Sequence, residues 1–320
     1  MPTVAASASA PGKVILFGEH AVVYDQPAIA VPLAAVRTVA EAHPAETGAG
    51  LVVHALDVGQ RLRVNWETPQ TPWFNALIYP AQLALRALEA PIPDMTLRVR
   101  STIPIASGLG SGAALATAII RALGKAHERP FAREQLNALV YEVEKRHHGT
   151  PSGIDNTVIV YEQPVYFVRG TPPQPFTIAA PLTLLVADSG HPSPTRETVG
   201  DVRKLYEAAP ERIGAVFERI GQIARDARAA IESGDVAALG PLMDANQAAL
   251  RALEVSSPAL ERLCTAARQA GALGAKLSGG GRGGNIIALT PPEHVPNVRR
   301  ALQEAGAVRI IETVVTPARP

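Results

Sequence analysis

The chain has 320 residues, 47% hydrophobic and 18% charged, which is enough apolar material for one large core or, as we expect, two ordinary ones. Thirty Lys and Arg against 29 Asp and Glu leave a formal net charge of +1, so no whole-chain field attracts nucleic acid or an anionic membrane. The single cysteine, Cys264, excludes an internal disulfide, and without a basic leader or a long apolar run we expect a cytoplasmic globular protein with no membrane partner.

The first third of the chain predicts mostly strands. Alternating or β-branched apolar patterns favour strands at residues 13–17, 28–39, 50–55, 61–64 and 95–100. Residues 75–88 show helical spacing, with Pro80 marking a first turn or a kink.

A glycine-rich turn then separates strand from helix. The turn leads into predicted helices at residues 113–127 and 133–147, which Pro130 separates. After a further glycine-containing loop, residues 156–161 and 165–169 fit either two strands or a short helix and a strand, and periodicity leaves both alternatives open.

The proline-rich residues 171–175 predict a linker, so we expect domains at residues 1–175 and 176–320. The second half predicts an α+β layer. Its expected helices are residues 196–208, 212–233, 236–253, 258–270 and 296–305, and its expected strands are residues 182–188, 275–278, 285–290 and 308–315.

The glycine-rich segment P-I-A-S-G-L-G-S-G-A runs from Pro104 to Ala113. Exposed backbone N–H groups and the helix dipole attract anions at such a position, and glycine lets the main chain approach closely. We therefore expect a nucleotide phosphate there. The candidate ATP-binding residues are Pro104, Ser107, Gly108, Leu109, Gly110, Ser111, Gly112 and Ala113.

The same glycines also fit the G-x-G-x-x-A spacing of an NAD-binding fold. That alternative requires a second strand ending in an acidic residue about 20 residues later. Glu128 stands at that distance, but it lies in a turn leading to another helix, which weakens the dinucleotide interpretation. A second G-x-G-x-x-G begins at Gly279 in a strand-turn-strand setting, and each glycine run on its own is equally compatible with a tight structural turn.

The segment A-P-G-K-V-I-L-F-G-E-H places Lys13 at the entrance to an apolar strand, with Glu19 and His20 at its end. A lysine there can bridge phosphate oxygens or lower the pKa of a nearby hydroxyl. The structural alternatives are a snorkelling lysine and two ordinary strand-end residues.

The segment E-K-R-H-H-G-T-P-S-G-I-D-N places Glu144 near a helix end and Asp155 after a glycine loop. Two carboxylates beside a phosphate loop imply Mg²⁺. The alternatives are a helix N-cap for Asp155 and a solvated helix face for Glu144. No H-E-x-x-H or G-x-S-x-G run occurs, so zinc and serine hydrolases lack support.

Taken together, the Lys13 segment, the Pro104 segment and K-L-S-G-G-G-R-G-G-N from Lys276 resemble the three motifs of the GHMP kinase superfamily. Within it, G-E-H and the Asp155 loop resemble the mevalonate kinases most closely. The resemblance implies a ribosomal-S5-like N-terminal domain that binds ATP and a ferredoxin-like C-terminal domain that closes the substrate cleft. It also implies phosphoryl transfer from ATP to the 5-hydroxyl of mevalonate.

The resemblance further assigns roles to individual residues. Asp155 corresponds to the group that orients or deprotonates the hydroxyl, Lys13 to its electrostatic partner, and Glu144 to a magnesium ligand. Glu19, His20 and Thr195 correspond to groups at the mevalonate pocket.

Two positions depart from the family pattern. Gly112 stands where relatives commonly carry a magnesium-binding serine, so Ser111 or a water is expected to substitute. Arg282 replaces a small residue and is expected either to contact phosphate or to point into solvent. The remaining alternatives are a kinase for phosphomevalonate or a sugar, and an inactive nucleotide-binding regulator. Dimer formation is a tendency of this family, so the resemblance also suggests a homodimer.

Overall fold

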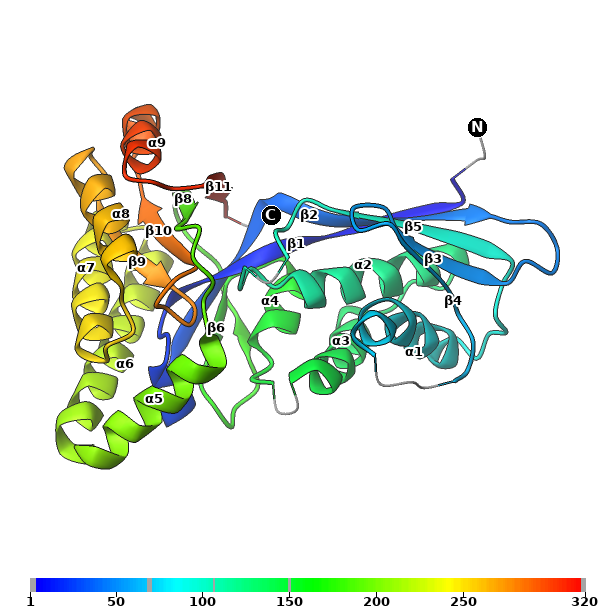
Figure 1. Ribbon diagram of the computed structural model, residues 1–320, viewed down its shortest axis with the longest axis horizontal. Helices are drawn as coiled ribbons and strands as arrows, with labels where there is room; N and C mark the ends of the chain where they lie inside the picture. Colours follow the sequence, from blue (N-terminus) through cyan, green and yellow to red (C-terminus); the bar gives the residue numbers. More distant parts are fainter. Residues whose placement is uncertain (1–3, 68–70, 106, 149–150, 318–320) are drawn as a thin grey trace. The chain divides into compact units, whose positions relative to one another are not determined.

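The computed structural model describes residues 4–67, 71–105, 107–148 and 151–317. They form two compact units (Figure 1). The N-terminal unit comprises Met1–Gly12 and Val36–Glu162, and the C-terminal unit comprises Lys13–Ala35 and Gln163–Pro320. The segment that carries the Lys13 motif therefore packs with the later half of the chain.

The N-terminal unit is a sheet covered by helices on one face (Figure 1). Its strands follow the order β4-β3-β5-β2, with β3 and β5 parallel, and β1 also pairs with β2. The strands of this sheet are β1 (Ala6–Phe17), β2 (Ala28–Pro44), β3 (Leu51–Ala55), β4 (Gln60–Arg63) and β5 (Met95–Ser101). Residues 13–17 of β1 and 28–35 of β2 belong to the C-terminal unit. The helices are α1 (Tyr79–Ala87), α2 (Ser111–Ala126), α3 (Arg133–His148) and α4 (Ile154–Tyr161).

The C-terminal unit contains a four-stranded antiparallel sheet in the order β11-β8-β10-β9. Its strands are β8 (Leu182–Asp188), β9 (Gly274–Ser278), β10 (Asn285–Leu289) and β11 (Arg309–Val315). Four helices separate β8 from β9, and one separates β10 from β11. They are α5 (Thr195–Ala208), α6 (Pro210–Ser233), α7 (Val236–Ala252), α8 (Pro258–Gln269) and α9 (Val295–Glu304). A strand order of 4-1-3-2 with these crossovers is the ferredoxin-like arrangement.

Short elements complete both units. A 3-10 turn, η1 (Ala21–Tyr24), follows the Lys13 motif, and a π-helical turn, η2 (Phe74–Ile78), precedes α1, so Pro80 lies in the first turn of α1. The strand β6 (Val165–Phe167) pairs with Ala28–Ala30 of β2 and with β7 (Gln174–Pro175) inside the expected linker. A second 3-10 turn, η3 (Pro292–His294), leads into α9.

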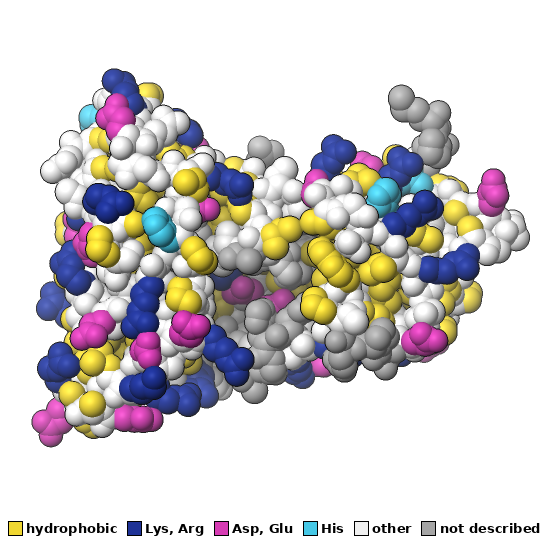
Figure 2. Space-filling view, viewed as in Figure 1, with side chains coloured by type: hydrophobic (Ala, Val, Ile, Leu, Met, Phe, Trp, Pro, Cys, Tyr) yellow, Lys and Arg dark blue, Asp and Glu magenta, His cyan; other side chains and the backbone are white. Residues whose placement is uncertain are grey.

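The sheet and helices of the C-terminal unit enclose an apolar core. It includes Leu185, Ile220, Leu250 and Leu277, and the predicted core position of Cys264 is confirmed because its side chain is fully buried. Figure 2 shows positive and negative side chains interspersed over the visible face of this unit, in keeping with the near-zero net charge. Within the described ranges, no helix has the length and apolar character that a membrane crossing requires.

Candidate active site

The glycine-rich segment leads directly into α2. Gly108 and Gly110 both adopt φ of 75°, and Gly110 is the N-cap of the helix, which no described side chain caps. Leu109 between them is buried and holds the loop on the core, while Ser107 donates a hydrogen bond of 2.7 Å from Oγ to the carbonyl of Pro104. Uncapped N–H groups at a helix start are an anion-binding arrangement.

The end of α3 returns to this loop. A Cβ built on Gly112 would lie 3.6 Å from Oε1 of Glu144, so the carboxylate lies over the first turn of α2. Glu144 is only 4% exposed, which excludes the alternative of a solvated helix face. Ser111 is partly buried at the first position of the helix, and Ala113 is buried beneath it.

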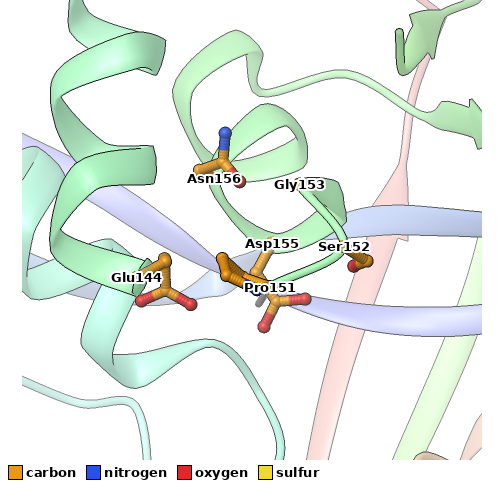
Figure 3. Close-up of a pocket in the computed structure, with 6 residues that line it drawn as sticks. All are labelled: Glu144, Pro151, Ser152, Gly153, Asp155 and Asn156. Carbon is orange, nitrogen blue, oxygen red and sulfur yellow. The ribbon is translucent and has the colours of Figure 1, made fainter. Parts of the chain in front are cut away.

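Asp155 lies in the first turn of α4. Gly153, with φ of 89°, is the N-cap of this helix, so the alternative N-cap role for Asp155 is wrong. Figure 3 shows the carboxylates of Glu144 and Asp155 pointing to the same side, with Pro151 between them. A pocket in the N-terminal unit is lined by Glu144, Pro151, Ser152, Gly153, Asp155 and Asn156.

Two contacts fix this pocket to α3. The amide of the buried Asn156 donates to Oδ1 of Asn137 at 2.7 Å, and the hydroxyl of Tyr141 donates to the carbonyl of Pro151 at 3.3 Å. The backbone on both sides of Asp155 is therefore tied to the helix that carries Glu144. Ala106, Gly149 and Thr150 of the two motifs lie outside the described residues.

Lys13 and Glu19 belong to the C-terminal unit and are both buried, with 6% and 2% exposure. A snorkelling lysine keeps its ammonium in water, so that alternative does not fit Lys13. Glu19 forms a fully buried ion pair with Lys276 of β9. Burial raises the pKa of Glu19, opposed first by Lys276 and more weakly by Lys13.

His20 follows with a positive φ of 62°, at the centre of a tight turn in which Ala21 N donates to the carbonyl of Glu19 at 2.7 Å. Its Nε2 lies 3.0 Å from the carbonyl oxygen of Gly280, which ties the end of β1 to the glycine run after β9. Burial lowers the pKa of His20 to about 4, so its ring is neutral at pH 7.

Thr195 begins α5 and is exposed, yet it lies against the same glycine run. A Cβ on Gly280 would lie 2.5 Å from Oγ1 of Thr195 and 2.9 Å from Oγ of Ser193. The Ser193 hydroxyl also donates to the carbonyl of Gly281 at 2.9 Å. The structure thus brings His20 and Thr195 to the same short stretch of backbone.

Close backbone contacts explain Gly281 and Gly283 of this run. A Cβ on Gly281 would lie 2.1 Å from the carbonyl oxygen of Val255, and one on Gly283 would lie 2.3 Å from that of Pro192. The guanidinium of Arg282 is half-buried and forms an ion pair of 2.6 Å with Asp201 on α5. A phosphate contact for Arg282 stays a prediction.

The predicted residues thus form one group in each unit. The phosphate loop, Glu144 and Asp155 lie together in the N-terminal unit. Lys13, Glu19, His20 and Thr195 belong to the C-terminal unit, where His20 and Thr195 lie against the glycine run. Sequence reasoning missed Lys276, whose only signal was a lysine in an otherwise uncharged buried strand. Among the described residues, no three His, Cys, Asp or Glu side chains cluster as a resident metal would require.

Comparison with known proteins identifies the family. The model for the GHMP kinases N terminal domain matches residues 76–163, and the model for the GHMP kinases C terminal matches residues 227–308. A mevalonate kinase of Pyrococcus horikoshii is 35% identical, with the match covering 96% of this chain and 95% of that protein. One of Aeropyrum pernix is 37% identical, covering 89% and 88% of the two chains.

A solved structure agrees over the full length. The crystal structure of L. major mevalonate kinase in complex with R-mevalonate matches with a TM-score of 0.83 at 29% identity, covering 100% of this chain and 99% of that one. The predicted two-domain α+β fold, with a ribosomal-S5-like and a ferredoxin-like part, is confirmed. The chain therefore belongs to the GHMP kinases and, within them, to the mevalonate kinase family.

Proposed function

We propose that this protein transfers the γ-phosphoryl group of ATP to the 5-hydroxyl of mevalonate, giving 5-phosphomevalonate and ADP. Two relatives that match 96% of this chain at 35% and 34% identity are mevalonate kinases. The structural observation that carries the proposal is the position of the Glu144 carboxylate over the first turn of α2, in a pocket that also includes Asp155. A phosphate-binding helix start and two carboxylates suit phosphoryl transfer, which depends mainly on positioning and charge neutralisation.

The glycine-rich loop is the proposed ATP-binding site. Gly108 and Gly110 leave the backbone accessible, and the N–H groups at the start of α2 face outward with the positive end of the helix dipole. Pro104 and Ser107 hold the entry to the loop through their hydrogen bond. These donors suit the β- and γ-phosphate oxygens.

Asp155 is the proposed group that orients the 5-hydroxyl and accepts its proton as the hydroxyl oxygen bonds to the γ-phosphorus. The bond from that phosphorus to the bridging oxygen of ADP breaks at the same time, so the electron pair leaves with ADP. Lys13, the other proposed catalytic residue, supplies a positive charge for the transferring phosphoryl oxygens. Glu19, His20 and Thr195 are the proposed contacts to mevalonate.

The carboxylates also suit Mg²⁺, which binds through one or two carboxylates together with substrate phosphates. Glu144 is the proposed ligand, and the hydroxyl of Ser111 is the nearest candidate in the loop, because Gly112 has no side-chain oxygen. When bound, the ion neutralises phosphate charge.

The test is an acceptor screen with product identification by NMR, using the wild type, Asp155→Asn and the matched control Asp226→Asn on the exposed face of α6. We expect 5-phosphomevalonate from the wild type and the control. Loss of the proton acceptor should lower kcat about 10²- to 10⁴-fold in Asp155→Asn without changing the unfolding transition. Near-normal turnover in that variant, or preference for phosphomevalonate or a sugar, contradicts the proposal.

A further inference from the structure

Lys276 is the central residue of β9 and the one charged residue of that strand. It is 0% exposed and ranks among the largest fully buried side chains of the described residues. Its Nζ donates to the carbonyl of Leu277 at 2.6 Å and to the carboxylate of Glu19. Burial lowers the pKa of Lys276, and Glu19 is the main group that opposes this shift.

Only one oxygen of Glu19 is used by this ion pair. The second, Oε2, is buried and has no hydrogen-bond partner among the described residues. Lys276 is also the largest influence that opposes the effect of burial on the Glu19 carboxyl. The charge and the orientation of Glu19 therefore both depend on Lys276.

His20 presents a second acceptor of the same kind. Its Nε2 faces a carbonyl oxygen, which can only accept, so Nε2 carries the proton and Nδ1 is left with its lone pair. Nδ1 is also buried without a partner among the described residues. Two successive residues thus each carry a buried acceptor that lacks a donor, although buried polar atoms are normally paired. A substrate hydroxyl is a donor that fits.

Stability does not explain the ion pair. Replacing a buried pair by apolar groups of similar volume is often neutral or stabilising, whereas removing one partner leaves an uncompensated charge and is strongly destabilising. A functional role for the Glu19 carboxylate accounts for a buried lysine at this position.

We propose that Lys276 is a positioning residue for the kinase reaction, which holds Glu19 as an anion by one oxygen and so presents the other oxygen, together with His20 Nδ1, to hydroxyl groups of the acceptor substrate. This inference rests on the proposed function in assigning Glu19 and His20 to that substrate. Lys276 itself acts through Glu19.

The first experiment is a double-mutant cycle with Lys276→Met, Glu19→Gln and the double variant, followed by KM and kcat for mevalonate. Lys276→Gln, which keeps an N–H donor for the Leu277 carbonyl, is a second charge-removing variant. We expect Lys276→Met and Glu19→Gln each to raise KM for mevalonate about tenfold, equivalent to about 1.4 kcal/mol, with KM for ATP unchanged. The double variant should match Glu19→Gln, because Lys276 acts only through Glu19.

The control is Lys204→Met, which removes an exposed lysine of α5 that pairs with Asp201 three residues away in its own helix. We expect wild-type constants from it. Additive effects in the cycle, or a wild-type KM in both Lys276 variants, overturn the inference. Recovery of KM in the double variant overturns it too, since that result assigns the pair a purely structural role.

Opposite pH dependences of binding and stability provide a second readout. Without Lys276 the Glu19 pKa rises further, so KM for mevalonate should increase as pH falls from 8 to 5. Stability has the opposite slope, because a carboxyl with a raised folded pKa contributes stability at low pH that is lost as pH rises through that pKa. The stability deficit of Lys276→Met should therefore grow with pH, while that of the double variant stays flat.

The other ionisable groups that face the Glu19–Lys276 pair do not account for a pH dependence that differs between the variants. Lys13 of β1 is present in every variant. The pKa values of His20 and Cys264, about 4 and about 12, lie outside the range from pH 5 to 8. Equal pH slopes in Lys276→Met and the wild type overturn the inference.

Carbon-13 NMR of the glutamate carboxyls tests Lys276 without any substrate. The Glu19 signal is identified by its absence in Glu19→Gln, and it should titrate at higher pH in Lys276→Met than in the wild type. An unchanged midpoint overturns the inference. Failure of the wild type to phosphorylate mevalonate would instead overturn the proposed function, so the two failures are distinguishable.

Discussion

Gly112 occupies the second position of α2, where a side chain has room. A Cβ there would make an ordinary contact of 3.6 Å with Oε1 of Glu144, and its φ is not in the left-handed region. We expect Gly112→Ala to raise the free energy of unfolding by about 0.5–1 kcal/mol, because alanine reduces the entropy of the unfolded chain. Urea unfolding measures this, and a loss of stability would show that the loop needs glycine for another reason.

A serine at the same position tests whether a side-chain hydroxyl there improves magnesium binding. Its hydroxyl would lie close to the Glu144 carboxylate, and Mg²⁺ prefers oxygen ligands. We expect Gly112→Ser to reach half-maximal activity at lower Mg²⁺ concentration than Gly112→Ala, which is the matched control for the added Cβ. Identical magnesium titrations would show that the hydroxyl does not reach the ion.

Local motifs predict which residues are candidates but not their long-range partners. Gly108, Gly110 and Asp155 could be proposed because each stands in a recognisable loop next to a helix. The partner of Arg282, Asp201, lies 81 positions away, and neither alternative drawn from the sequence included it. No short-range pattern carries such information. The catalytic and binding roles themselves stay predictions.

Helix α7 and strand β9 approach so closely that their backbones touch. A Cβ on Gly240 would lie 2.3 Å from the carbonyl oxygen of Leu273, and one on Gly274 would lie 2.3 Å from the carbonyl oxygen of Gly240. We expect Gly240→Ala to destabilise the protein by about 1–3 kcal/mol through overpacking. Chemical denaturation measures the change.

Gly200 on α5 is the matched control, because nothing lies within 4 Å of a Cβ built there. The same substitution should stabilise the helix by up to about 1 kcal/mol, reflecting propensity alone. Equal effects at the two glycines would contradict the close approach of α7 and β9.

At the scale of elements, periodicity predicts most helices and strands to within a few residues. Two strands are longer than predicted, since β1 begins at Ala6 and β2 ends at Pro44. The segment after the Asp155 loop carries the β-branched run N-T-V-I-V-Y, which suits a strand, so both alternatives stayed open. It forms α4, which packs on α2 and α3 with its valines and isoleucines buried. Tertiary packing overrides propensity here. The helical spacing of apolar residues at 75–88 does not distinguish the π-helical turn before α1 from an ordinary helical turn.

Cys264 offers a probe for the molecule as a whole. It is the single thiol of the chain, fully buried in the core of the C-terminal unit, and burial raises its pKa to about 12. We expect no reaction with a thiol reagent at pH 7 in the native protein and rapid reaction in urea. The reaction rate against urea should follow the unfolding of that unit by circular dichroism. Fast labelling of the native protein would contradict this packing.

Which parts of the chain assemble together was only partly predictable. Composition and the proline-rich stretch suggested one cut near residue 175, and that domain division stays a prediction. Contacts group residues 13–35 with the later half, which no compositional boundary marks. The cytoplasmic location and the homodimer likewise stay predictions, because they depend on surroundings and partners that a single sequence does not encode.

The Glu19–Lys276 ion pair joins positions 257 apart in the chain. During translation Glu19 emerges among the first residues, yet its only direct cationic partner among the described side chains is made after four-fifths of the protein. A nascent or truncated chain ending before β9 would have to leave this carboxylate in water or protonate it. The ion pair can therefore form only once β9 has been synthesised, so the environment that Glu19 has in the folded protein is among the last to be completed.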